Sequence, residues 1–267
     1  MADVDSDSEN INLFQEPADY YPPSPKPTQE THTLLSGKKI TVSLVGHNPL
    51  WGHHLWNAGR VVSTYFEKNP SLVRGKTVLE LGAGAGLPSL LCAELGASKV
   101  VVTDYPDPDL VKNLWLNIDT TFYGDDEKKD GEKSIVAEGY CWGADAEPLL
   151  AHLPPGDEKK KKKKKKKGFE VLILADLLFN HSEHGKLVAT IEATLARTKE
   201  ATALVFFTPY RPWLYEKDMA FFDLVREKGF TVEKVLEEKM EKVMFVEDRG
   251  DEELRRTVFG YVVSWAR

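Results

Sequence analysis

The chain has 267 residues, long enough for one large α/β domain, and its 42% hydrophobic and 29% charged residues are ordinary for a soluble protein. The net charge is −7, and nine consecutive lysines at 159–167 contribute +9 to it, so the rest of the chain has a net charge of −16. An acidic surface disfavours nucleic acid as a partner and favours a basic protein segment. The first residues form no apolar signal segment and the apolar run 171–179 is too short to cross a bilayer, so we expect a cytoplasmic protein with no membrane contact.

The N-terminal part precedes the regular pattern of the domain. Residues 1–35 are acidic and polar and include five prolines, which predicts a mostly disordered arm. Alternating apolar residues at 40–45 predict a strand or hairpin arm. Residues 46–67 are predicted to be largely helical and carry Trp51 and Trp56. These indoles either pack that helix onto the sheet or form a lid over a ligand pocket.

The most informative segment follows. Thr77–Leu81 is a short apolar run typical of a buried parallel strand, Gly82–Gly86 is a turn of small residues, and the next nine residues predict a helix. Asp104 ends the next predicted strand, twenty positions after Gly84, where an acid can accept hydrogen bonds from both ribose hydroxyls of an adenosine. The alternative is an ordinary tight turn. The spacing of the acid favours a nucleotide or adenosyl site.

The spacing of the glycines indicates the ligand. A dinucleotide fold places its third glycine three positions after the second, whereas here the glycines stand at 82, 84 and 86 and position 87 is Leu. Glu80 precedes the turn, and a carboxylate there suits a cationic ligand better than a pyrophosphate. S-adenosylmethionine has an ammonium and a sulfonium and no phosphate. The pattern therefore favours the methyl donor over NAD.

The rest of the chain alternates strands with helices. Helices are predicted at 107–119, 144–152, 186–199 and 214–228, and strands at 99–103, 135–142, 170–179, 202–208, 230–240 and 258–265. We expect an α/β fold, a seven-stranded Rossmann-like class I methyltransferase with a mostly parallel doubly wound sheet and an antiparallel last strand. The domain is predicted to span 36–267, with a lysine-rich loop insertion at 156–168. That run could instead bind RNA or ribosomes or direct nuclear import.

The candidate catalytic residues follow two predicted strands. Asp176 is the ionisable residue of an apolar strand, and its alternative role is a helix cap or structural hydrogen bond. We expect Asp176, with Asn180 or Tyr210, to receive an amine through hydrogen bonds at the carboxyl ends of the strands. His181 and His184 lack an apparent third ligand, so we expect no metal site.

Pro49-Leu50-Trp51-Gly52-His53 with Leu55-Trp56-Asn57-Ala58-Gly59, the turn at 82–86 and the stretch 176–184 together resemble the seven-strand lysine methyltransferase-like family, over roughly residues 36–267. Within it the chain is similar to the fungal enzymes that methylate the N-terminal glycine and adjacent lysine of translation elongation factor 1-alpha. The resemblance implies S-adenosylmethionine contacts, which would fall on Trp56, Gly82, Ala83, Gly84, Asp104, Trp142 and Ala175. From the sequence, Trp142 at the end of a predicted strand is also well placed to stack on adenine, and its alternative role is a tryptophan of the core.

The substrate is less narrowly defined than the donor. A small-molecule N-methyltransferase of the nicotinamide type is the first alternative, and an NAD-dependent oxidoreductase or a non-catalytic binding module is a further one. A protein substrate fits the acidic body of the chain, and we expect a monomer that binds no nucleic acid directly.

Overall fold

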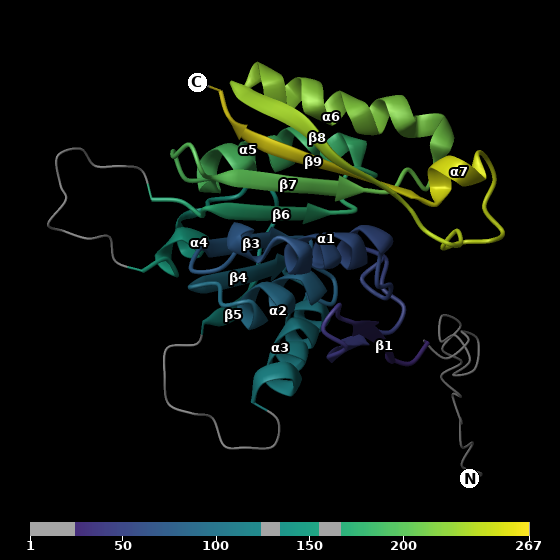
Figure 1. Cartoon of the computed structure of the whole chain (residues 1–267), viewed down its shortest axis with the longest axis horizontal. Coiled ribbons are helices and arrows are strands. Elements are labelled where there is room, and N and C mark those ends of the chain that lie inside the picture. Colours follow the sequence, from purple (N-terminus) through teal and green to yellow (C-terminus); the bar gives the residue numbers. More distant parts are fainter. Residues whose placement is uncertain (1–24, 124–133, 155–166, 267) are drawn as a thin grey trace, which may run out of the picture.

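The structure, a computed structural model, describes residues 25–123, 134–154 and 167–266 (Figure 1). Its strands are β1 (Thr28–Thr33), β2 (Lys39–Leu44), β3 (Thr77–Leu81), β4 (Lys99–Asp104), β5 (Ile135–Gly139), β6 (Val171–Ala175), β7 (Thr202–Phe207), β8 (Phe230–Lys239) and β9 (Thr257–Trp265). Its α-helices are α1 (Asn57–Lys68), α2 (Leu87–Glu94), α3 (Pro108–Phe122), α4 (Glu147–Ala151), α5 (His184–Thr194), α6 (Tyr215–Glu227) and α7 (Glu252–Arg255).

The large sheet has seven strands in the order β5-β4-β3-β6-β7-β9-β8. Strands β3 to β7 pair in parallel, and β9 is antiparallel to both β7 and β8. The seven-stranded, mostly parallel sheet with an antiparallel last strand is therefore confirmed. The strand order reverses between β3 and β6, and in such sheets ligands bind beyond the carboxyl ends of the strands at this switch point.

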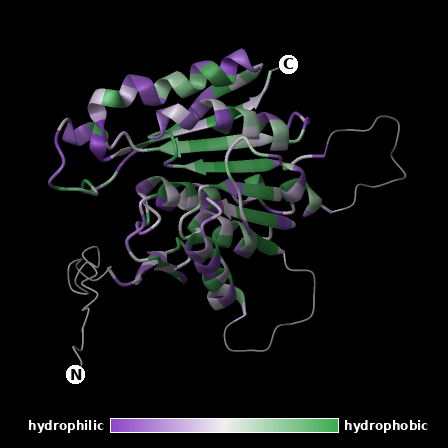
Figure 2. Ribbon diagram, turned by 180° about the vertical axis from the view of Figure 1, so that it is seen from behind, coloured by the Kyte–Doolittle hydropathy of each residue, from purple (hydrophilic) through white to green (hydrophobic). Residues whose placement is uncertain are grey.

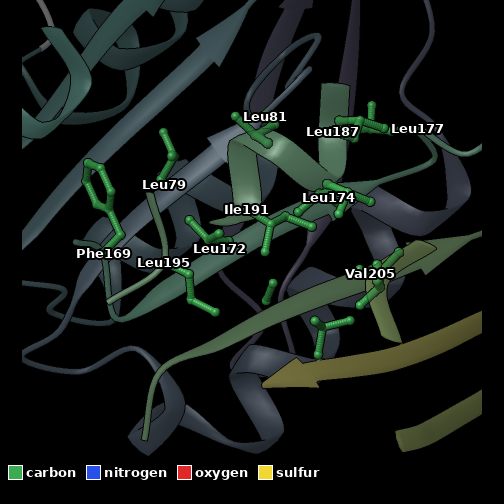
Figure 3. Close-up of a cluster of buried hydrophobic side chains, with 14 of the residues drawn as sticks. Leu79, Leu81, Phe169, Leu172, Leu174, Leu177, Leu187, Ile191, Leu195 and Val205 are labelled. Atoms are coloured by element: carbon green, nitrogen blue, oxygen red, sulfur yellow. The ribbon is translucent and has the colours of Figure 1, made fainter. Parts of the chain in front are cut away.

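Helices cover both faces of the sheet, because the strands are apolar on both sides (Figure 2). Alternate residues of each strand belong to different buried clusters. Val78 and Ile173 pack in the cluster that includes α1, α2 and α3, whereas Leu79 and Leu172 pack with α5 and α6. Figure 3 shows the second cluster, in which Leu187 and other side chains of α5 contact the sheet. This two-sided core holds the carboxyl ends of the strands in fixed relative positions.

Strands β1 and β2 form a separate antiparallel hairpin. The alternation at 40–45 correctly predicts β2, but β1 includes residues that the sequence assigned to the arm. Asn117 of α3 attaches the hairpin to the domain. Its side chain accepts a hydrogen bond from Ser43 N–H at 2.7 Å and donates to Ser43 O and to Ala85 O at 2.9 and 3.0 Å. The hairpin is thus held against both α3 and the glycine turn.

Several boundaries differ from the prediction: β5 ends at Gly139 and not at residue 142, and α5 spans His184–Thr194 and not 186–199. Residues 46–56 are turns and bends, and α1 begins at Asn57, with Trp51 in a left-handed conformation at φ 63°. Strand β6 ends at Ala175 because Asp176, at φ 55°, turns the chain out of the sheet. Residues 1–24 of the predicted arm and 156–166 of the predicted lysine-rich insertion lie outside the described residues. Among the helices described, none has the length and hydropathy to cross a membrane.

Candidate active site

A cavity of about 800 Å³ lies beyond the carboxyl ends of β3, β4 and β6, at the switch point. Its lining includes every residue predicted to bind the donor, namely Trp56, Gly82, Ala83, Gly84, Asp104, Trp142 and Ala175. The carboxyl ends of the four parallel strands β3, β4, β5 and β6 and the segment before α1 contribute these residues. The volume lies in the range of small-molecule and cofactor sites.

The glycine turn lines the cavity with backbone that carries no side chains at Gly82 and Gly84. Gly82 and Gly84 have φ values of 57° and 56°, a left-handed conformation that L side chains rarely adopt. A Cβ at Gly82 would lie 2.6 Å from Leu177 Cδ2 and 3.2 Å from Trp142 Cζ2, whereas a Cβ at Gly84 would meet nothing within 4 Å. Gly82 therefore allows close packing under the cavity, and Gly84 leaves space beside its backbone.

Two buried acids give the cavity its electrostatic character. Glu80 is 1% exposed, and its Oε2 accepts a hydrogen bond from Ser89 N–H at the start of α2 at 2.9 Å. Burial raises the pKa of Glu80 to about 8. Asp104 accepts hydrogen bonds from Gly84 N–H at 2.6 Å and Tyr105 N–H at 2.7 Å, and burial raises its pKa as well. A bound cation would stabilise the ionised form of both carboxyls, whereas a bound pyrophosphate would destabilise it further.

Asp176 anchors the start of α1 while facing the cavity. Its Oδ2 accepts a hydrogen bond from Ala58 N–H at 2.9 Å, and its Oδ1 accepts one from Thr208 N–H at 2.6 Å. Burial raises its pKa to about 7, against the opposing effect of these two hydrogen bonds. The structural alternative that the sequence left open, a hydrogen bond at a helix end, is therefore present. Asp176 nevertheless lines the cavity as well.

The other two candidate residues lie on different sides of Asp176. The hydroxyl of Tyr210 donates to Asp176 Oδ2 at 3.4 Å and accepts from Asn57 N–H at 3.4 Å. Asn180 lines the large cavity, and its Oδ1 accepts a hydrogen bond from Ser182 Oγ at 2.9 Å. The structure thus brings Asp176 and Tyr210 together, whereas Asn180 stands at the edge of the large cavity.

A second cavity of about 250 Å³ adjoins the first. The two share Trp51, Trp56, Asp176, Phe179 and Arg211. The smaller one is otherwise lined by residues of the segments after β6, β7 and β8, namely Leu178, Phe207, Thr208, Tyr210, Asp218, Phe245 and Asp248. Sequence reasoning missed Asp218 and Phe245. The predicted strand 230–240 ends before Phe245, and Asp218 lies within the predicted helix 214–228, so no local pattern marks either residue as part of a site.

The fold is the Rossmann-like fold of methyltransferases of known structure. The structure is similar to precorrin-6y C5,15-methyltransferase from Geobacter metallireducens (TM-score 0.50, 10% identity, 82% of this chain and 98% of that chain). It is also similar to Trm5b from Pyrococcus abyssi (TM-score 0.50, 15% identity, 90% of this chain and 56% of that chain). At these identities the likeness concerns the fold.

Sequence comparison gives the family. A family model described as lysine methyltransferase matches residues 36–228, and the chain belongs to this family. Its relatives include the protein N-terminal and lysine N-methyltransferase efm7 of Neurospora crassa, 54% identical over 98% of this chain and 91% of that protein. The protein of the same name in Schizosaccharomyces pombe is 42% identical over 98% of both chains. The predicted family membership is confirmed.

Proposed function

We propose that this protein is an S-adenosylmethionine-dependent methyltransferase that modifies the N-terminal glycine and the adjacent lysine of translation elongation factor 1-alpha, in the cytoplasm. The observation that carries the proposal is the junction of the two cavities at Trp56 and Asp176, one large enough for a donor and one smaller and partly aromatic. The names of the relatives support a protein terminus and a lysine as acceptors.

The large cavity fits an adenosyl donor in shape and charge. Asp104 would hold the ribose hydroxyls, Glu80 would complement the ammonium of the methionine part, and Trp142 would stack on the adenine. The space beside Gly84 allows a ligand to approach the backbone closely. When bound, S-adenosylmethionine supplies a methyl group on a positively charged sulfur, which a neutral amine can displace.

The residues between the cavities would position the acceptor. Asp176 and Tyr210 lie where an amine entering from the smaller cavity would meet the larger one, and they can orient its nitrogen through hydrogen bonds. An α-amino group has a pKa near 7.7 to 8 and a lysine near 10.4, so a chain terminus is about a hundredfold richer in the neutral form at neutral pH. The site then acts chiefly by holding the amine in place and excluding water.

The test is a methylation assay with purified components. We expect the protein, given methyl-labelled S-adenosylmethionine, to label unmethylated elongation factor 1-alpha, and mass spectrometry to locate the label on the first two residues. An Asp104→Asn variant serves as the control, because it weakens the donor site without touching the smaller cavity. Labelling of nicotinamide in place of the protein would overturn the proposal. A gene deletion that leaves the methylation of the elongation factor unchanged in cells would do so too.

A further inference from the structure

Three aromatic rings from distant parts of the chain wall the smaller cavity. Trp56 stands just before α1, Tyr210 follows β7, and Phe245 lies between β8 and α7. The ring centroids of Trp56 and Tyr210 are 5.0 Å apart, those of Trp56 and Phe245 5.7 Å, and those of Tyr210 and Phe245 5.8 Å. The planes meet at 62° to 69°, so the rings contact one another edge to face and do not stack. Such walls can surround an alkylated ammonium.

The charges around the cavity also suit a cation. Asp218 is 5% exposed and lines the cavity, with its Oδ1 2.7 Å from Nε2 of His181. Burial raises the pKa of Asp218 against the opposing effect of His181. Asp176 and Asp248 line the same cavity, and Arg211, which donates to the carbonyl of Phe179, is the cationic residue in its lining. Carboxylates thus outnumber the guanidinium at this cavity.

Phe245 is fixed in place by the backbone that carries it. Its carbonyl oxygen accepts a hydrogen bond from Nη1 of Arg255 at 2.8 Å, and Arg255 is 6% exposed. His54 lies beside both Phe245 and Trp56, with ring centroids 5.3 and 5.5 Å away. The ring therefore belongs to a defined surface. Phe245 does not line the large cavity, which separates its contribution from that of the donor site.

We propose that Trp56, Tyr210 and Phe245 form an aromatic cage that binds the ammonium group of the acceptor before proton loss and the methylated ammonium afterwards, with Asp218 as its counter-ion. This assignment rests on the proposed function, because it identifies the smaller cavity as the acceptor side of the same site. It explains why an aromatic residue from the segment after β8 folds back to the start of α1. A cage of this kind selects charged amines over neutral molecules of the same shape.

The test compares two peptides in isothermal titration with the full-length protein. The two peptides have the same sequence from a lysine at position 2 onward and differ only in the group at position 1. In one the terminal amine is trimethylated, and in the other a 3,3-dimethylbutanoyl group replaces the trimethylglycyl group, so a neutral carbon stands where the charged nitrogen was. We expect the wild-type protein to bind the charged peptide about tenfold more tightly. Phe245→Leu, which keeps an apolar side chain without a ring, should lose most of this preference, and Phe245→Trp should keep it.

Trp213→Leu is the matched control. Trp213 is 63% exposed and lines neither cavity, so its replacement removes an aromatic ring of the same region without altering the cage. We expect this variant to keep the preference. The affinity of each variant for S-adenosylhomocysteine and its melting temperature report whether the fold and the donor site are intact.

Each outcome decides the assignment. The cage is refuted if the wild-type protein binds both peptides equally or neither of them, or if Phe245→Leu and Trp213→Leu give the same preference. Should Phe245→Leu fail to fold, Phe245→Met, which also lacks a ring, takes its place in the same comparison with Trp213→Leu, because the nearby carboxylates alone would favour the charged peptide. The proposed function is tested separately by label transfer to the elongation factor. Label transfer without charge preference overturns the cage alone, and charge preference without label transfer overturns the function alone.

Discussion

The buried Glu80 carboxyl gives the sharpest test of the electrostatic argument. Its pKa is about 8 in the folded protein because burial disfavours the charged form, whereas an unfolded chain has a value near 4.5. The folded state therefore binds more protons than the unfolded state between these values, and stability falls as the pH rises from about 4.5 to 8. Glu80→Gln removes this titration and keeps an oxygen that can accept from Ser89 N–H.

The magnitude follows from the size of the pKa shift. Each unit of pH between the two pKa values costs about 1.4 kcal/mol, so the wild-type protein should lose about 2 to 3 kcal/mol between pH 6 and pH 9 that the Gln variant does not lose. For a domain of this size that corresponds to about 5 to 10 °C in the melting temperature. We therefore expect the melting temperature of the wild-type protein, relative to that of Glu80→Gln, to fall by about 5 to 10 °C from pH 6 to pH 9. Circular dichroism measures both melting temperatures.

The same variant reports on the ligand. A bound cation near Glu80 would lower its pKa, so wild-type binding of S-adenosylhomocysteine should release a proton near pH 7 and strengthen towards pH 8. Isothermal titration in buffers of different ionisation enthalpy measures the released proton, and the Gln variant should release less. The reasoning would be refuted if the difference in melting temperature between the wild-type protein and Glu80→Gln were the same at pH 6 and at pH 9.

Three further predictions follow from named contacts. Asp176→Asn should lower turnover at least about tenfold with little change in donor affinity, because Asp176 lies between the two cavities. Unchanged initial rates with a lower melting temperature would mean that Asp176 only anchors α1. Gly82→Ala should lower the midpoint of urea unfolding more than Gly84→Ala. Both incur about 1 to 2 kcal/mol for the left-handed backbone, but only the first adds a clash with Leu177, and equal midpoints would contradict this. Asn117→Ala should destabilise the protein by about 2 to 3 kcal/mol in the same assay, because it leaves Ser43 N–H without its acceptor and Ala85 O without its donor; a loss below about 0.5 kcal/mol would mean that water replaces both bonds.

The sequence by itself determined the succession of strands and helices and the donor side of the site. Thr77–Leu81, the glycine turn and Asp104 lie within a single strand–turn–helix–strand unit, so their spacing along the chain already specifies their spacing in space. This local unit predicted an adenosyl site at the glycine turn and Asp104, and those residues line the large cavity. Trp56, Trp142 and Ala175, which the resemblance to the family implied, line it as well.

Only the tertiary structure decided the smaller cavity. Phe245, Tyr210 and Trp56 meet because the order of the sheet brings the ends of three distant segments to one edge, and no periodicity along the chain records such a meeting. The pairing of Asp218 with His181 and the anchoring of α1 by Asp176 have the same origin. Local patterns fix the elements because propensity and burial act over a few residues, whereas the smaller cavity arises from how those elements pack.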